Sequence, residues 1–213
     1  KTQAVVAGTF TQNKVAAAPV YVSKEVVATG TAHAIVANAG CANACTGQQG
    51  LDDAHKMAQI AADELGVNAH DVIVGSTGVI GVNLPMDKLE AGIKDAVANL
   101  SPDGSDNAGR AIITTDTHSK SVTCEFELSG KTVRMGAIAK GSGMIRPNMA
   151  TMLCYITTDI AIDQALLQKA VSGCVEKSFN MISVDGDMST NDMVIVLANG
   201  EANNAKITEE NAD

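Results

Sequence analysis

The chain has 213 residues, of which 46% are hydrophobic and 18% charged, so it can fold around a substantial core and is not wholly disordered. Its formal net charge is -9, and it carries no basic stripe of the kind that drives binding to nucleic acid or to anionic membranes. We therefore expect no nucleic acid and no membrane as partners, while the acidity leaves a small-molecule substrate possible.

Short apolar runs closed by turn residues predict five strands along the chain. In chain order these are Ala4–Phe10, Ala34–Ala39, Val72–Gly75, Thr151–Thr158 and Met193–Ala198. Residues 122–128 alternate apolar and polar side chains, which is the pattern of a half-buried strand. Ser129 and Gly130 then turn the chain into a further strand at Val133–Ile138, which predicts a hairpin.

Apolar side chains at helical spacing predict three helices. The first runs from Asp52 to Leu65, and the second begins at Pro85 with its inward side continuing to Leu100. Asp163 is the expected N-cap of the third, whose apolar side extends to Cys174. Helices and strands in this mixed order predict a domain in which helices are layered on sheet.

The cysteines lack the paired spacing of a zinc site, so we expect buried, reduced thiols and no bound metal. They are Cys41, Cys45, Cys124, Cys154 and Cys174, of which the third and fourth lie on expected apolar faces. No apolar stretch is long enough to span a bilayer, and no signal peptide opens the sequence. The expected location is the cytoplasm.

A glycine-rich segment leads into the fourth predicted strand: Lys140-Gly-Ser-Gly-Met-Ile-Arg-Pro-Asn-Met-Ala-Thr151-Met-Leu153. A threonine hydroxyl needs a base to become a good nucleophile, and the free α-amine of an N-terminal threonine is one such base. Attack of the Thr151 hydroxyl on the Ala150 carbonyl, followed by hydrolysis of the resulting ester, would expose that amine. The alternative is a plain loop before a strand, which is the structure that such glycines more commonly indicate.

The same run resembles the junction motif of the glutamate N-acetyltransferase family, also called ornithine acetyltransferases, which act in arginine biosynthesis. Four further segments resemble family segments in the same order, so the resemblance covers essentially the whole chain. They are Asn38-Ala-Gly-Cys-Ala-Asn-Ala-Cys-Thr-Gly47, Ser76-Thr-Gly-Val-Ile-Gly81, Thr114-Thr-Asp-Thr117 and Asp185-Gly-Asp-Met-Ser-Thr-Asn-Asp192. The implied fold class is α+β, a layered helix and sheet sandwich resembling N-terminal-nucleophile enzymes of the ornithine acetyltransferase type.

The resemblance also implies roles for residues that the pattern leaves open. Thr151 matches the nucleophile, the Ala150–Thr151 bond matches the site of self-cleavage, and Thr77 with Gly78 matches the oxyanion hole. Read without the resemblance, Ser76-Thr-Gly is a turn that ends a strand.

Two further positions match substrate contacts of the family. Thr114 and Lys140 are implied to bind substrate together with Thr151, and an ammonium suits the α-carboxylate of an acetylated amino acid. From the sequence alone, Lys140 is instead a solvated surface charge and Thr114 a residue at a helix end.

The implied reaction moves an acetyl group from N2-acetylornithine to glutamate through an acetyl-threonine intermediate, without a cofactor, and some family members also use acetyl-CoA. Residues 1–150 would be the α-chain segment and residues 151–213 the start of the β-chain, packed in one domain. Two cleaved protomers would form a heterotetramer of two α and two β chains.

Two alternatives remain. One is an N-terminal-nucleophile amidohydrolase or aminopeptidase, in which water replaces glutamate; the other is an inactive fragment that only binds a partner. Family members are longer, so their C-terminal substrate-binding residues have no counterparts in this sequence. Asp185 to Asp192 is expected to form a turn or a wall of the site, because Thr190 stands where a calcium-binding EF-hand requires glycine.

Overall fold

The computed structural model describes residues 2–146 and 152–210, which form two sheets with helices between and outside them. One sheet has six strands in the order β2-β1-β8-β7-β6-β5, and the other pairs β3 with β4. The strands are β1 Ala4–Phe10, β2 Thr31–Ala32, β3 Ala34–Cys41, β4 Val72–Val79, β5 Lys120–Leu128, β6 Lys131–Lys140, β7 Leu153–Thr158 and β8 Met193–Ala198. The helices are α1 Ala18–Thr29, α2 Gly47–Leu65, α3 Met86–Ala98, α4 Ser105–Ala111 and α5 Gln164–Glu176, with short 3-10 turns at Ala69–Asp71 and Phe179–Met181.

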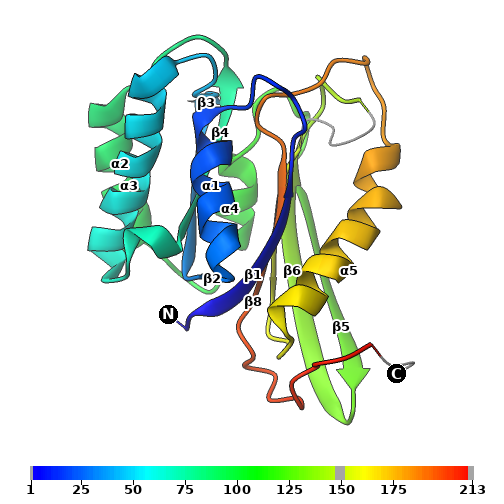
Figure 1. The fold of residues 1–213 in the computed structure, drawn as a ribbon. Coiled ribbons are helices and arrows are strands. Elements are labelled where there is room, and N and C mark those ends of the chain that lie inside the picture. The colour runs from blue at the N-terminus through cyan, green and yellow to red at the C-terminus, as the bar shows by residue number, and fades with distance from the viewer. Residues whose placement is uncertain (1, 147–151, 211–213) are drawn as a thin grey trace.

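The elements are arranged in layers, which Figure 1 shows from the side. Helix α5 covers one face of the six-stranded sheet, while α1 and the β3–β4 sheet cover the other. Helices α2 and α3 form the outer layer beyond β3 and β4. The α+β sandwich of sheets and helices is therefore confirmed.

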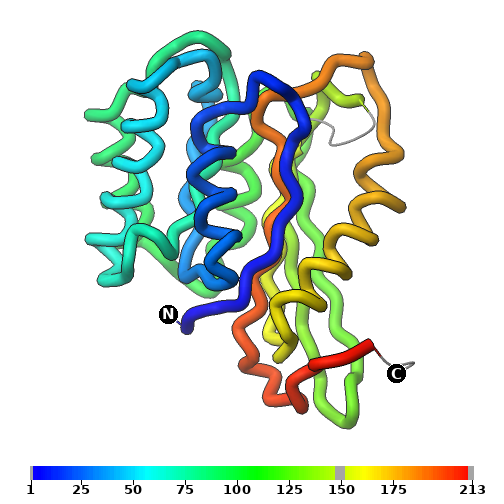
Figure 2. Tube along the Cα trace, viewed as in Figure 1, coloured from blue at the N-terminus to red at the C-terminus, as the bar shows by residue number. Residues whose placement is uncertain are grey.

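The central strands of the large sheet are buried on both faces. In β8, Met193 and Ile195 face α1 and β4, whereas Val194 and Val196 face α5. This burial explains why the strand reads as an unbroken apolar run. β8 pairs antiparallel with β1 and parallel with β7, and Figure 2 shows the N-terminal strand running beside the C-terminal one.

The predicted strands are largely present. β1 and β8 have the expected bounds, while β3 and β4 continue past the expected ends to Cys41 and Val79. β7 begins at Leu153, so the expected start at Thr151 is wrong: the Met152 amide bonds to the Asp192 side chain and Met152 is not part of the strand. Thr151 itself lies outside the described residues.

The hairpin of β5 and β6 is present, but β5 is not half buried as its alternation predicts. It forms the edge of the sheet, and Val122 is 65% exposed and Phe126 40% exposed. Alternating side chains show that a strand forms, but they do not show that another layer covers it.

The three predicted helices are present with shifted ends. α2 begins at Gly47 rather than Asp52, and α3 ends at Ala98, which leaves the expected core residue Leu100 69% exposed. Asp163 caps α5 as predicted, because its carboxylate accepts a hydrogen bond from the Ala165 amide at 3.0 Å.

The expectation of buried thiols is correct for Cys154 and wrong for most of the others. Cys45, Cys124 and Cys174 are exposed, and Cys41 is partly buried. All five are free thiols. Burial raises the pKa of Cys154 to about 11, so this thiol stays protonated and behaves as a small apolar side chain.

Two helices are absent from the sequence prediction. α1 is rich in β-branched valines and has no side-chain N-cap, and Val20, Val22 and Val26 are buried on different sides of it. It packs against β4, α2 and β1, so its buried side is broad and only one narrow side is exposed, which obscures the apolar periodicity of a surface helix. The short α4 has only Gly109 buried and shows no apolar stripe.

Candidate active site

A buried lysine brings three of the predicted site residues together. Lys140 is the last residue of β6 and is only 4% exposed. Its Nζ donates hydrogen bonds to Thr77 Oγ1 at 3.0 Å and to Thr114 Oγ1 at 2.9 Å. The alternative in which Lys140 is a solvated surface charge is therefore wrong.

The surroundings of Lys140 disfavour the charged form of its side chain. Burial lowers its pKa, while the nearby carboxylate of Asp116 raises it and so opposes the shift. Both threonine hydroxyls accept their hydrogen bonds from this ammonium, so each keeps its own hydrogen to donate elsewhere. The cluster therefore combines one cation with two hydroxyl donors.

Thr77 and Gly78 lie near the carboxyl end of β4, where it pairs in parallel with β3. Thr77 is 7% exposed, and Gly78 pairs with Gly40. Gly78 has a φ of +132°, and a Cβ placed there would lie 2.3 Å from the carbonyl carbon of Gly40. The position therefore requires glycine for both its backbone conformation and its close contact with β3.

We expect Gly78→Ala to lower the free energy of unfolding by roughly 3 kcal/mol or more, since the new methyl group clashes with backbone in a strained conformation. Gly81→Ala is the matched control, because Gly81 also has a positive φ, +81°, but a Cβ added there would meet no atom within 4 Å. Denaturant unfolding of both variants measures the difference. Equal losses would show that the contact with Gly40 is unimportant.

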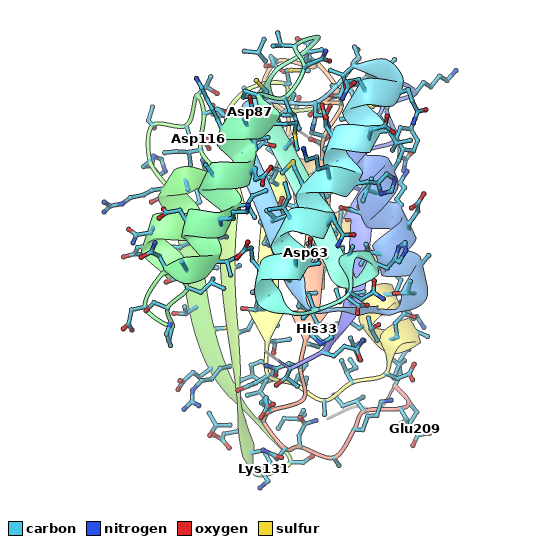
Figure 3. The ribbon with its side chains drawn as sticks, turned by 90° about the vertical axis from the view of Figure 1, so that its left-hand side faces the viewer. His33, Asp63, Asp87, Asp116, Lys131 and Glu209 are labelled. Carbon is cyan, nitrogen blue, oxygen red and sulfur yellow. The ribbon has the colours of Figure 1, made fainter. Side chains whose placement is uncertain are left out.

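Thr114 and Asp116 lie in the segment between α4 and β5. The Asp116 side chain is buried, and its Oδ1 accepts hydrogen bonds from Lys120 Nζ at 2.5 Å and from the Gly141 amide at 2.8 Å. Burial raises the pKa of Asp116, but these bonds outweigh it and hold the pKa below its usual value. Figure 3 places Asp116 toward one end of the molecule and Lys131, at the β5–β6 turn, at the other.

Asn191, just before β8, ties the strand ends together. Its Nδ2 donates to the carbonyl oxygens of Ala42 at 2.6 Å and Ser76 at 2.8 Å, and its Oδ1 accepts from Thr190 Oγ1 at 2.6 Å. These bonds hold the ends of β3 and β4 against the start of β8. Sequence reasoning assigns Asn191 no role of its own, although it lies in the polar segment from Asp185 to Asp192 that is expected to form a turn or site wall.

The predicted nucleophile and cleavage site, Thr151 and Ala150, lie outside the described residues. The next residue along the chain is Met152, whose amide donates to Asp192 Oδ1 at 2.9 Å. Leu153 follows and pairs with Lys140 across β6 and β7. The start of β7, two residues after Thr151 in the sequence, thus lies beside the lysine and threonine cluster.

Over residues 2–146 and 152–210, no group of three or more His, Cys, Asp or Glu side chains is placed to hold a metal ion. In the same part of the chain, no helix combines the length and apolar character needed to cross a membrane. The described site presents hydroxyls, carboxylates, backbone amides and the Lys140 ammonium.

A charged and polar cluster buried at strand ends of an α+β sandwich is typical of an enzyme active site. The whole chain, residues 1–213, matches the ArgJ family. It belongs to that family, and the resemblance to the ornithine acetyltransferases is confirmed.

Known relatives agree with this assignment. The chain is 56% identical over 201 residues to the arginine biosynthesis bifunctional protein ArgJ of Symbiobacterium thermophilum, an alignment that covers 94% of this chain and 50% of that protein. The match to ArgJ of Bacillus subtilis is 49% identical and covers 100% of this chain and 52% of that protein. The chain thus spans about half the length of the curated relatives it matches.

Solved structures share the fold. The arginine biosynthesis bifunctional protein of Bacillus halodurans matches with a TM-score of 0.62 at 46% identity, covering 69% of this chain and 76% of that one. The ornithine acetyltransferase of Mycobacterium tuberculosis, solved in complex with ornithine, matches with a TM-score of 0.61 at 36% identity, covering 70% of this chain and 78% of that one.

Proposed function

We propose that the protein containing this chain transfers an acetyl group from N2-acetylornithine to glutamate through an acetyl-threonine intermediate on Thr151. The observation that carries the proposal is the buried Lys140 ammonium, bonded to the Thr77 and Thr114 hydroxyls beside the strand that follows Thr151 in sequence. Family membership supplies the reaction class.

Self-cleavage comes first. The Thr151 hydroxyl attacks the Ala150 carbonyl, the C–N bond breaks, and the nitrogen takes up a proton as the ester forms. Water then hydrolyses the ester and leaves a carboxylate on Ala150 and a free amine on Thr151. This amine has an ordinary pKa near ~7.7–8.0, so much of it is neutral and can act as a base at physiological pH.

Acetyl transfer follows in two steps. The Thr151 hydroxyl attacks the acetyl carbonyl and passes its proton to the α-amine, and the proton then leaves with ornithine as the amide bond breaks. The amine of glutamate next attacks the acetyl ester, which restores the Thr151 hydroxyl and releases N-acetylglutamate. In this scheme acetyl-CoA can replace N2-acetylornithine as the donor in the first step.

The described residues support this scheme in specific roles. Thr77, whose oxygen already accepts from Lys140, donates its hydrogen to the oxyanion together with the Gly78 amide. An ammonium has three N–H donors, and among the described residues Lys140 uses two of them, on threonine hydroxyls. We assign the third to the substrate α-carboxylate, with Thr114 as a neighbouring contact.

Cleavage need not separate the two pieces. β6 and β7, which lie on opposite sides of the proposed cut, pair from Met135 with Thr158 to Lys140 with Leu153, and β1 pairs with β8. Both pieces therefore contribute neighbouring strands to one sheet. We propose that they remain together as α and β chains, and that two such protomers form the heterotetramer.

The test uses the full-length polypeptide. Intact-mass measurement should find two fragments that meet at Ala150 and Thr151, and labelled acetyl should move from N2-acetylornithine to glutamate. Omitting glutamate separates this activity from hydrolysis, because a hydrolase would release acetate at an unchanged rate. An uncut chain with full transfer activity would exclude the free-amine mechanism.

A further inference from the structure

Aspartate carboxylates hold the connection between β6 and β7 on both sides of the proposed cut. One comes from the segment before β5 and two from the segment before β8, and each accepts at least one hydrogen bond from a backbone amide of that connection. The bonds run from the Gly141 amide to Asp116 at 2.8 Å, from the Met144 and Ile145 amides to Asp185 at 2.7 and 3.0 Å, and from the Met152 amide to Asp192 at 2.9 Å.

Asp185 holds the N-terminal side. One of its oxygens accepts from the Met144 amide and the other from the Ile145 amide. The hydrogen bond from Met144, with those from Asp187 and Ile145, lowers the pKa of Asp185, so it remains ionised at neutral pH. The Val184 amide also donates to the Ile145 carbonyl at 2.9 Å, which fixes this part of the connection from both sides.

Asp192 holds the C-terminal side and is completely buried. Its Oδ1 accepts from the Met152 amide, while its Oδ2 has no hydrogen-bond partner among the described residues. Burial raises the pKa of Asp192 to about 7, against the effects of the Met152 amide, the Ser189 hydroxyl and the positive charge of Lys140. A buried carboxyl with an unbonded oxygen is costly for the fold, so its presence points to a role beyond packing.

We propose that Asp192 is a positioning residue. By binding the amide of Met152, it fixes the residue that directly follows the nucleophile, both during self-cleavage and in the cut enzyme. This inference rests on the proposed function, in which Thr151 is that nucleophile. Small displacements of reacting groups cost large factors in rate, so a fixed neighbouring amide matters.

Asp185 has a different part in the same arrangement. Asp192 and Met152 both belong to the segment after the cut, so their hydrogen bond stays within one chain. Asp185 lies after the cut but binds Met144 and Ile145 before it, so cleavage turns its hydrogen bonds into contacts between the two chains. Asp185 therefore acts mainly on the cleavage step.

The pH dependence of thermal stability distinguishes a positioning role of Asp192 from a role in which it only stabilises the fold. The folded-state pKa of Asp192 is raised from 3.8 to about 7, so ionisation is harder in the folded protein than in the unfolded one. Its contribution to stability therefore falls as pH rises from the unfolded pKa to the folded pKa. Asp192→Asn removes this titration, so we expect it to unfold at the same or a higher temperature than the parent at pH 8.

The experiment compares four variants of the full-length polypeptide: Asp192→Ala, Asp192→Asn, Asp185→Ala and Asp187→Asn. Intact mass follows the rate of cleavage, and labelled acetyl exchange gives turnover per cut molecule. We expect Asp192→Ala to slow both by about 100-fold, and Asp192→Asn, which keeps an oxygen acceptor, to recover much of the loss. Asp185→Ala should slow cleavage more than transfer.

Asp187→Asn is the matched control. Asp187 is exposed in the same segment, and in the described structure it is its amide, not its carboxylate, that bonds to Asp185. Cleavage and exchange at the parent rate in Asp192→Ala would overturn the positioning proposal and leave the proposed function standing. So would a loss of activity in both Asp192 variants that only parallels a loss of thermal stability. A parent that is never cut at Ala150–Thr151 would overturn both.

Discussion

Thr151→Ala should leave the full-length polypeptide uncut and lower acetyl exchange by at least about 10³-fold. The variant removes the hydroxyl that attacks the Ala150 carbonyl and later carries the acetyl group, and losing a nucleophile commonly costs this much or more. Intact mass measures the cut, and transfer of labelled acetyl from N2-acetylornithine to glutamate measures turnover.

Thr151→Ser is the matched control, because it keeps a hydroxyl and removes only a methyl group. We expect it to be cut and to transfer acetyl more slowly than the parent, since it lacks the branched Cβ that restricts χ1. Wild-type turnover in Thr151→Ala would show that another group carries the acetyl. Equal defects in both variants would point to a packing effect instead.

Thr77→Val should lower kcat for acetyl transfer by about 10²–10³-fold, because one oxyanion donor is lost while the shape of the side chain is kept. The change also removes an acceptor 3.0 Å from Lys140 Nζ, so a stability loss of about 1–3 kcal/mol is expected alongside it. Steady-state kinetics and denaturant unfolding measure the two effects separately.

Thr114→Val is the control for indirect effects through Lys140. It removes the other hydroxyl bonded to Lys140 and leaves the proposed oxyanion donor in place. We expect its main effect on KM, in keeping with a substrate contact. Thr77→Ser should restore most of the lost kcat. A Thr114→Val defect in kcat as large as that of Thr77→Val would instead assign the effect to Lys140.

The pattern of apolar residues along the sequence predicted helices and strands best where the burial of side chains is uniform along the whole segment. β8 is apolar throughout and β1 is largely so, and both keep their predicted bounds; the carboxylate of Asp163 caps its helix as expected. The pattern failed where burial depends on neighbours, as in α1, which is covered on several sides, and in β5, whose side chains are mostly exposed.

For the site, the order of family-like motifs pointed to Thr77, Gly78, Thr114 and Lys140, and the fold brings these residues together. Sequence reasoning missed Asp192 and Asn191 as structural members of the site. A polar segment before a buried strand was the available signal, but it does not say which amides those side chains reach.

By itself, the sequence identified the family and the α+β class, because periodicity and motif order are local properties of the chain, and it predicts a cleavage junction at Thr151. Only the tertiary structure decided that Lys140 is buried between two threonine hydroxyls rather than solvated. It also decided that carboxylates from distant segments hold the connection between β6 and β7. These contacts join residues tens of positions apart, and the bond from Lys140 to Thr77 forms only when the two sheets pack together.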